Sequence, residues 1–231
     1  MPPGAATAVP GAPPPFGTAL ANNLPLLLSG LVTTVSLSAL ALILALALGL
    51  VFGVLRITPL APLRALGTVY VEFFRNTPLL VQTFFAYFGL PAVGVKLPGF
   101  TAAFLALGIY TGSFVAEVVR AGILSIGRGQ LEAARALGLS YAQMMRHVVV
   151  PQAVATTVPP LGNLVIALVK NSSLASTIAV ADLMYNGEIV NSRTFATYEI
   201  FGFVALCYLV LTLPMGGLVG ALEHRLTRYR R

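Results

Sequence analysis

Apolar residues form long runs separated by short polar stretches, and this pattern predicts membrane-spanning helices. The first run, Gly30–Leu55, precedes Arg56, which is the first ionisable side chain in the chain. As a helix it is long enough to cross a hydrocarbon core of about 30 Å. We predict four further spans at Ala65–Leu90, Gly99–Val119, Val148–Val169 and Glu199–Leu222.

The fourth span is interrupted by residues that disfavour a regular helix. Pro159 and Pro160 are adjacent, and Gly162 follows them closely. A proline inside a helix lacks a backbone donor and clashes with the preceding turn. We therefore expect a kink or a break here, with Lys170–Tyr185 forming a short, partly embedded helix after it. Irregular backbone at membrane depth requires a protein or water-filled environment.

The longest polar interruption, Gln130–Pro151, separates the third span from the fourth. Gly129 and Gly138 leave room for about two helical turns, fewer than an isolated helix needs in water. On a helical wheel, one half holds Ala133, Ala134, Leu137 and Gly138, and the other holds Glu132 and Arg135. Docking onto neighbouring residues or a partner should therefore order this helix. Gly138 suits a left-handed stop, and Ser140 with Gln143 fits a capping box.

Composition places the chain in the membrane class. It is 57% hydrophobic and 9% charged, whereas soluble domains carry about a quarter charged residues. The net charge of +7 comes from arginine-rich loops and the C-terminal tail. Positive charge beside spans reports topology, so we predict no nucleic-acid partner. The single cysteine, Cys207, lies in an apolar run and reads as a packing residue.

The residues before the first span form a Pro/Ala-rich tail at positions 1–16, which we expect to be disordered. This tail lacks the basic region of a signal peptide, so the apolar segment after it should be retained. With the N-terminus outside, eleven Lys and Arg residues fall on the cytoplasmic side. Only Lys96 and Arg193 fall outside, and Lys170 lies in the membrane region. The distribution predicts an outside N-terminus and a cytoplasmic C-terminus.

Lys170 is the most informative charge, because an unpaired lysine at mid-membrane costs about 2.5–3.5 kcal/mol. Asn171, Ser172 and Ser173 follow it directly. Polar groups beside a broken helix suit a zwitterionic solute that crosses the membrane. The alternative is that Lys170 reaches the outer headgroups while the serines cap the short helix.

Polar residues in the second span allow two interpretations as well. Asn76, Thr77 and Gln82 could line a pathway or could serve polar helix packing. Two acidic–basic pairs are spaced three residues apart, namely Glu72 with Arg75 and Glu117 with Arg120. We predict that each forms a structural ion pair on one helix face.

No constellation in the sequence predicts bond-breaking chemistry. His147 and His224 stand beside arginines without carboxylate or cysteine partners at ligand spacing. Asp182 and Glu188 are expected on a solvated face of the outer segment. The phosphate-loop pattern GxxxxGK[ST] does not occur, because no Gly is followed by Lys. We therefore predict no ATPase site in the chain, no metal and no cofactor.

The polar interruption resembles the EAA loop of bacterial ATP-binding-cassette (ABC) importer permeases. The resemblance rests on the spacing of Glu132, Ala133, Ala134, Gly138, Val148, Val150 and Pro151. Flanking segments are similar to the polar amino acid branch, of the histidine/glutamine/arginine type: Tyr70–Pro91, Ala116–Ala134 and Lys170–Ser176. The chain departs from the usual pattern at Val148 and Val150 (usually Ile and Leu), Gly127 (often Pro) and Asn171 (often Asp).

The resemblance implies an all-α membrane protein, a five-span type I ABC importer transmembrane domain over residues 17–231. Its coupling loop would cover residues about 125–150 in the cytoplasm, with Glu132, Ala133, Ala134 and Gly138 docked in a cleft of the ATPase. The implied partners are ABC ATPase subunits, a second identical or homologous permease and an extracytoplasmic solute-binding protein. The implied setting is the bacterial inner membrane and its lipid, and the implied mechanism is alternating access.

Two other classes remain open at the level of sequence. An ion-coupled secondary carrier or channel would transport without an ATPase and usually shows internal repeats, but we see no convincing repeat. A membrane scaffold that only recruits a cytoplasmic protein would give Lys170 no purpose. On the family resemblance, Lys170, Asn171, Ser172 and Ser173, together with Asn76, Thr77 and Gln82, are the candidates for the path of a polar amino acid.

Overall fold

The computed structural model describes Pro15 and residues 17–228, and this part of the chain is almost wholly helical. Four of its helices are long and apolar enough to span a membrane, at Thr18–Leu55, Gly99–Leu124, Tyr141–Ile178 and Thr197–Arg225. The all-α membrane class is therefore confirmed. The predicted disordered tail, residues 1–16, lies outside the described residues except for Pro15 and has no structural account.

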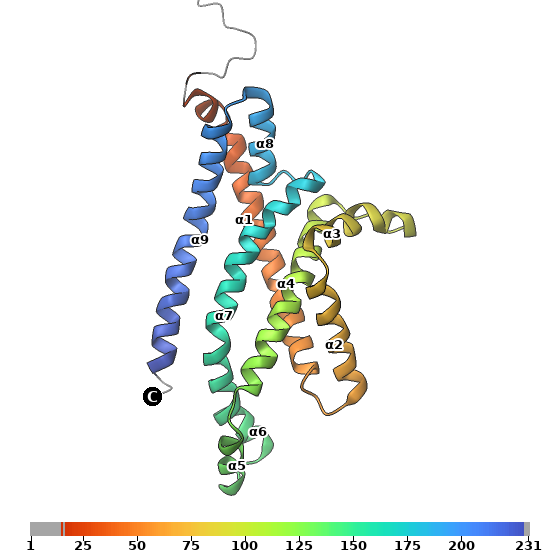
Figure 1. The fold of residues 1–231 in the computed structure, drawn as a ribbon, viewed down its shortest axis with the longest axis vertical. Helices are drawn as coiled ribbons and strands as arrows, with labels where there is room; N and C mark the ends of the chain where they lie inside the picture. The colour runs from red at the N-terminus through yellow and green to blue at the C-terminus, as the bar shows by residue number, and fades with distance from the viewer. Residues whose placement is uncertain (1–14, 16, 229–231) are drawn as a thin grey trace, which may run out of the picture.

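Four long helices run along the molecule and form its frame (Figure 1). They are α1 (Thr18–Leu55), α4 (Gly99–Leu124), α7 (Val150–Asn171) and α9 (Thr197–Arg228). α1 begins twelve residues before the predicted apolar run at Gly30. α4 begins at the predicted Gly99 and ends five residues beyond the predicted Val119.

α1 and α4 pack closely because glycines remove side chains from their interface. A Cβ atom at Gly49 would lie 2.2 Å from Val115 Cγ1, and one at Gly53 would lie 2.8 Å from the Ala116 carbonyl oxygen. Real Cβ atoms do not approach this closely, so both positions need glycine. The pair forms the centre of a core that also holds Ala41, Ala45, Leu107 and Leu168.

The second predicted span is broken rather than continuous. α2 (Ala61–Asn76) ends before Pro78, and α3 (Leu79–Phe84) begins after it. The residue before a proline disfavours the helical region, and Thr77 accordingly has an extended backbone (φ −107°, ψ 132°). After α3 the chain continues as a π-helical turn, Phe85–Gly89, and a 3₁₀ turn, Leu90–Val93.

The break predicted in the fourth span is absent, because α7 runs unbroken through Pro159 and Pro160. Contacts on both sides hold it helical. A Cβ atom at Gly162 would lie 2.1 Å from Val219 Cγ2 of α9, and one at Gly122 of α4 would lie 2.1 Å from Thr157 Cγ2. Gly162 is thus a packing residue and does not break the helix.

The predicted short helix from Lys170 to Tyr185 consists of two different elements. The first part is a 3₁₀ segment, Ser172–Ile178, that extends α7 and ends at Ala179 in a left-handed conformation (φ 57°). The second part opens α8 (Leu183–Thr194), which Asp182 caps by accepting a hydrogen bond from the Tyr185 backbone N–H at 2.8 Å. The chain therefore turns between them instead of continuing in one direction.

The two ends of the molecule carry different elements (Figure 1). α8 and the beginnings of α1 and α9 lie at one end, which we call the upper end. The α1–α2 turn, α5 (Arg128–Ala136) and α6 (Tyr141–Met144) lie at the other end, the lower end. α9 begins at the upper end and descends towards the lower end.

Candidate functional site

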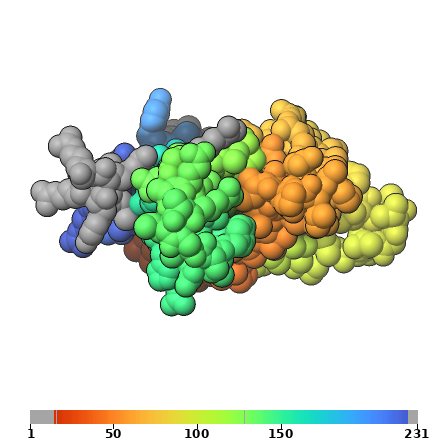
Figure 2. Space-filling model, turned by 90° about the horizontal axis from the view of Figure 1, so that it is seen from below, coloured from red at the N-terminus to blue at the C-terminus, as the bar shows by residue number. Residues whose placement is uncertain are grey.

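The segment between α4 and α7, residues 125–150, projects beyond the four long helices at the lower end, and we call it the terminal loop. It contains α5, α6 and a π-helical turn, Met145–Val149, that leads into α7. Seen from below, it is a protruding surface beside the α1–α2 turn (Figure 2). Its position makes it accessible to another protein.

The end of α5 and the beginning of α6 have the caps that the sequence predicts. Gly138 is left-handed (φ 74°), and its N–H donates to the Arg135 carbonyl at 2.9 Å. The Leu139 N–H donates to the Ala134 carbonyl at 3.1 Å, which completes a Schellman stop. Ser140 and Gln143 form the reciprocal capping box, with bonds of 2.9 and 3.4 Å. Hydrogen bonds within the loop therefore fix its shape.

The two faces of α5 have different surroundings. Ala134 is 3% exposed and packs with Met144 and Val149 in a small core inside the loop. Ala134 therefore docks onto the loop's own residues, which is one of the two alternatives expected for this helix, and its place in an ATPase contact stays a prediction. Glu132, Ala133 and Gly138 are exposed as expected.

Two large apolar side chains beside Gly138 point outward and complete the surface. Leu137 is 80% exposed and Tyr141 is 73% exposed. The sequence reasoning gave weight to the small residues and did not single out Tyr141 as a contact. The sequence does offer a signal for this surface, because two bulky residues, Leu137 and Tyr141, stand on either side of the helix stop at Gly138. We call Glu132, Ala133, Leu137, Gly138 and Tyr141 the outer face of the terminal loop.

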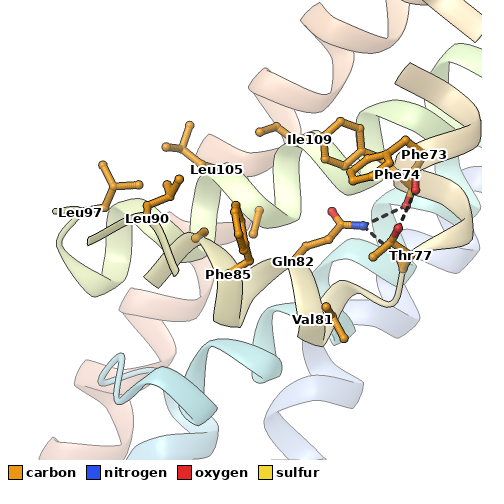
Figure 3. A pocket seen from close by; sticks show the side chains of 12 residues that line it. Phe73, Phe74, Thr77, Val81, Gln82, Phe85, Leu90, Leu97, Leu105 and Ile109 are labelled. Carbon is orange, nitrogen blue, oxygen red and sulfur yellow. Dashed lines mark hydrogen bonds between the residues drawn. The ribbon is translucent and has the colours of Figure 1, made fainter. Parts of the chain in front are cut away.

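The predicted pathway residues of α2 and α3 lie beside the largest hollow that we describe, of about 420 Å³. Thr77 and Gln82 line it among apolar side chains (Figure 3). Gln82 Nε2 donates to the carbonyls of Phe74 (2.9 Å) and Thr77 (3.0 Å), which closes the break before Pro78. Gln82 Oε1 is buried and has no hydrogen-bond partner in the described part of the chain. Asn76 is not among the lining residues, and its amide donates to the Glu72 carbonyl at 2.7 Å.

The four consecutive polar residues from Lys170 do not converge on one site. Lys170 and Ser173 line an open hollow of about 350 Å³ against α8 and α9, together with Tyr208. Asn171 and Ser172 line a crevice of only about 10 Å³ against α1, α3 and α4. The serine hydroxyls donate to their own helix, at the Val169 and Lys170 carbonyls (both 2.8 Å). These are bonds back to the preceding turn, so neither serine caps the 3₁₀ segment in the way that the alternative interpretation expected.

A cluster of charges joins three helices above the terminal loop. Glu117 of α4 pairs with Arg120 (2.5 Å) and Arg75 (3.6 Å), and it accepts a hydrogen bond from Arg56. The predicted Glu117–Arg120 pair is confirmed. The predicted Glu72–Arg75 pair is wrong, because Arg75 faces α4 and Glu72 lies 3.8 Å from Arg56 instead. The ion pairs between helices therefore depend on how the helices pack, which residue spacing within one helix does not predict.

The upper end buries an acid without a cation. Asp182 is 0% exposed, which contradicts the solvated face predicted for it, while Glu188 is exposed as predicted. The Oδ2 atom of Asp182 has no hydrogen-bond partner among the described residues. Burial raises the pKa of Asp182 to about 7. The Tyr208 hydroxyl lies near Asp182, Ser172 and Thr34.

Residues 45–228 match the family described as "Binding-protein-dependent transport system inner membrane component". The chain is 48% identical to a probable glutamine ABC transporter permease protein, GlnM, of Bacillus subtilis over 209 residues, which cover 90% of this chain and 97% of GlnM. A solved amino acid ABC transporter with histidines aligns with a TM-score of 0.84 at 38% identity, covering 90% of this chain and 97% of that one. The inward-facing MetNI methionine ABC transporter shares the fold, with a TM-score of 0.73 at 23% identity over 89% of this chain and 98% of that one.

Proposed function

The chain belongs to the family of binding-protein-dependent transport system inner membrane components and is the permease component of an amino-acid ABC importer, and we propose that separate ATPase subunits drive it through the outer face of the terminal loop. ATP-driven closure of these subunits would tilt the attached helices and open the path outward. Hydrolysis would return the path inward. The cycle is alternating access, with no covalent chemistry in this chain.

The exposed apolar pair on the terminal loop carries this proposal. Leu137 and Tyr141 are large, strongly exposed and held on a hydrogen-bonded loop. Aromatic and aliphatic side chains of this kind anchor protein interfaces when a partner buries them. Glu132 and Ala133 on the same outer face would add a polar contact and a close approach. A preorganised loop also loses little conformational entropy on docking.

We propose that the ATP is hydrolysed entirely by the partner. The chain lacks the GxxxxGK[ST] phosphate loop. The partner subunits would sit at the lower end, which the arginine distribution places in the cytoplasm with the C-terminus. The N-terminus and α8 would then face outward, where a solute-binding protein delivers the substrate. A second permease, identical or homologous, would complete the path.

The cargo we propose is a polar amino acid, and two side chains are best placed to meet it. Lys170 is one of the residues that line the hollow between α7, α8 and α9. The unpartnered Gln82 Oε1 belongs to a residue that lines the hollow between α2, α3 and α4. Asn171, Ser172, Ser173, Asn76 and Thr77 remain candidates with weaker support, because most of their described hydrogen bonds are local. GlnM is named for glutamine, which fits a neutral polar cargo.

The decisive experiment reconstitutes the permease in liposomes with a candidate ATPase and solute-binding protein. We expect uptake of a radiolabelled polar amino acid only when ATP and the ATPase are both present. The double variant Leu137→Ala, Tyr141→Ala should insert normally, bind the ATPase more weakly and take up less amino acid. Uptake that is indifferent to ATP would contradict the proposal and favour an ion-coupled secondary carrier.

A further inference from the structure

We propose that Glu117 and Arg75 are positioning residues for transport, and that their contact passes movement of the docked terminal loop to α2 and to the wall of the 420 Å³ hollow. This inference rests on the proposed function. It names the internal link between the place where the ATPase pushes and one of the two hollows that a substrate could enter.

The first step is the geometry around the Glu117 carboxylate. Oε1 receives Arg120 of the same helix at 2.5 Å. Oε2 receives Arg56, which follows the end of α1, and lies 3.6 Å from Arg75 Nη1 of α2. One carboxylate on α4 thus holds a guanidinium from each of three helices. The side chains of Arg56 and Glu117 are only 11% and 25% exposed, so solvent screens the cluster weakly.

The second step is that α2 depends on this link more than α1 does. α1 is locked to α4 by the glycine contacts at Gly49 and Gly53, which need no charge. α2 packs on α4 through Tyr70 and Val71, which form a buried cluster with Ala116. Its polar contacts with α4 are the Tyr70 hydroxyl, which donates to the Ile109 carbonyl at 2.7 Å, and Arg75 at its last turn. Arg75 also lies over the Phe114 ring, 5.1 Å from its centroid. Arg75 is therefore held by α4 on two sides.

The third step is the position of this contact along the chain. Glu117 lies about two turns before Leu124, where α4 gives way to the terminal loop. Arg75 lies one residue before Asn76, where α2 ends at the break. Phe74 and Thr77, on either side of that end, line the 420 Å³ hollow. A displacement of α4 by the docked loop would therefore move the hollow wall through the Glu117–Arg75 contact.

The charge balance explains why Glu117 is the member that cannot be spared. Three guanidiniums surround it. Glu72, whose side chain is 57% exposed, lies 3.8 Å from Arg56 and accepts a hydrogen bond from the Asn76 amide at 3.2 Å. Loss of the Glu117 charge would leave three like charges in a partly buried place, which separates the helices. Loss of Arg75 would leave Glu117 satisfied by Arg56 and Arg120. Arg75→Gln is thus the variant that removes the α2 link with the least effect on folding.

The test measures amino acid molecules transported per ATP hydrolysed in the reconstituted complex with its ATPase and binding protein. For Arg75→Gln we expect ATPase association and hydrolysis within twofold of wild type, and a transport ratio at least tenfold lower. Arg75→Lys should recover part of the ratio because it restores the charge. Glu117→Gln should lower the ratio at least as far, and Glu72→Gln is the matched control that should leave it unchanged.

A purely structural role predicts a different pattern. Arg75→Gln would then lower the amount of assembled complex, while the complex that forms would keep the wild-type ratio. That result, or a wild-type ratio in both Arg75→Gln and Glu117→Gln, would overturn the inference. Wild-type uptake that ignores ATP would instead refute the proposed function itself, and with it the role assigned to this contact.

Discussion

Glu117 and Asp182 are acidic side chains near opposite ends of the molecule, and both are largely shielded from solvent. Their surroundings differ in how they compensate the carboxyl group. Glu117 lies among Arg56, Arg75 and Arg120. Asp182 is fully buried beside hydroxyl groups, with its Oδ1 capping α8 and its Oδ2 unpartnered. A carboxylate paired with guanidiniums stays charged, whereas one buried without a cation favours the protonated form.

The difference indicates what each end has to do. At the lower end, long charged side chains join α2 to α4 at the Glu117–Arg75 contact, while α1 packs closely against α4 at Gly53. At the upper end, backbone atoms meet almost directly. The Asn186 amide donates to the Leu26 carbonyl at 2.8 Å, and Gly30 leaves no room for a Cβ beside the Asp182 carbonyl. The upper junction is a close-packed joint that resists sliding.

The largest expected effect concerns the pH dependence of the upper joint. The folded chain raises the pKa of Asp182 to about 7, above the value of about 3.9 in an unfolded chain. The folded state therefore holds its proton more tightly. The contribution of Asp182 to the free energy of unfolding is therefore fully present below about pH 4. It falls by up to about 4 kcal/mol as pH rises to about 7 and stays level above that. Thermal unfolding in detergent between pH 4 and 8 measures the fall.

Asp182→Asn is the matched variant, because an amide keeps the shape without the charge. It should remove the fall in stability with pH. An unchanged pH profile in this variant would show that another group causes the dependence and that the upper joint does not rely on a protonated acid.

The next effect is steric. Gly30→Val places a Cβ atom only 2.7 Å from the Asp182 carbonyl oxygen and 2.8 Å from Asn186 Nδ2, with two methyl groups beyond it. We expect a loss of about 3 kcal/mol in stability, the upper range for overpacking. The melting temperature in detergent reports it. Gly202→Val on α9, where nothing lies within 4 Å, is the control and should melt near the wild-type temperature. Equal melting of the two variants would contradict a close-packed upper joint.

A third effect separates the exposed side chains of the two ends. Leu137→Ala with Tyr141→Ala at the lower end should weaken ATPase association by about 2 kcal/mol, the size of an interface hot spot. Phe195 and Tyr198 at the upper end are 66% and 94% exposed, and their alanine variants should not change it. Binding measured by co-purification and by fluorescence titration tests both. Weakening by the upper-end variants would mean that exposed aromatic residues act non-specifically.

The smallest effect belongs to the edge of the charge cluster. Glu72 is more than half exposed and 3.8 Å from Arg56, and exposed pairs contribute about 0–1 kcal/mol. Glu72→Gln should therefore change stability by less than about 0.5 kcal/mol, measured by the same thermal unfolding in detergent. A larger loss would place Glu72 at the centre of the cluster and weaken the special role of Glu117.

Local sequence signals predicted much of the structure well. The left-handed stop at Gly138 and the capping box of Ser140 and Gln143 depend on backbone rules that act within a few residues. The apolar runs gave the long helices for the same reason. The terminal loop was recognised from its spacing, although its sequence left open whether Ala134 docks inside the loop or on a partner.

The errors arose where distant residues decide. Gly122 and Gly162 support a continuous α7 through two prolines by admitting Thr157 and Val219, contacts that no local pattern reveals. Arg75 pairs with Glu117 of α4 and not with Glu72 of its own helix. Asp182 is buried because α1 and α9 cover it. The break at Thr77 is different, because a local rule accounts for it: Pro78 restricts the backbone of the residue before it. The predicted continuous second span did not use that rule.

The central claim is that a separate ATPase docks on the outer face of the terminal loop, and site-specific cross-linking tests it most directly. Cys207 is the only cysteine, so Cys207→Ser gives a background for Leu137→Cys. With a short thiol-reactive cross-linker, we predict a covalent adduct between this cysteine and the ATPase. The yield of this adduct should increase when ATP closes the ATPase subunits. Tyr198→Cys at the upper end is the control. No adduct at position 137, or an equal adduct at position 198, would contradict the account.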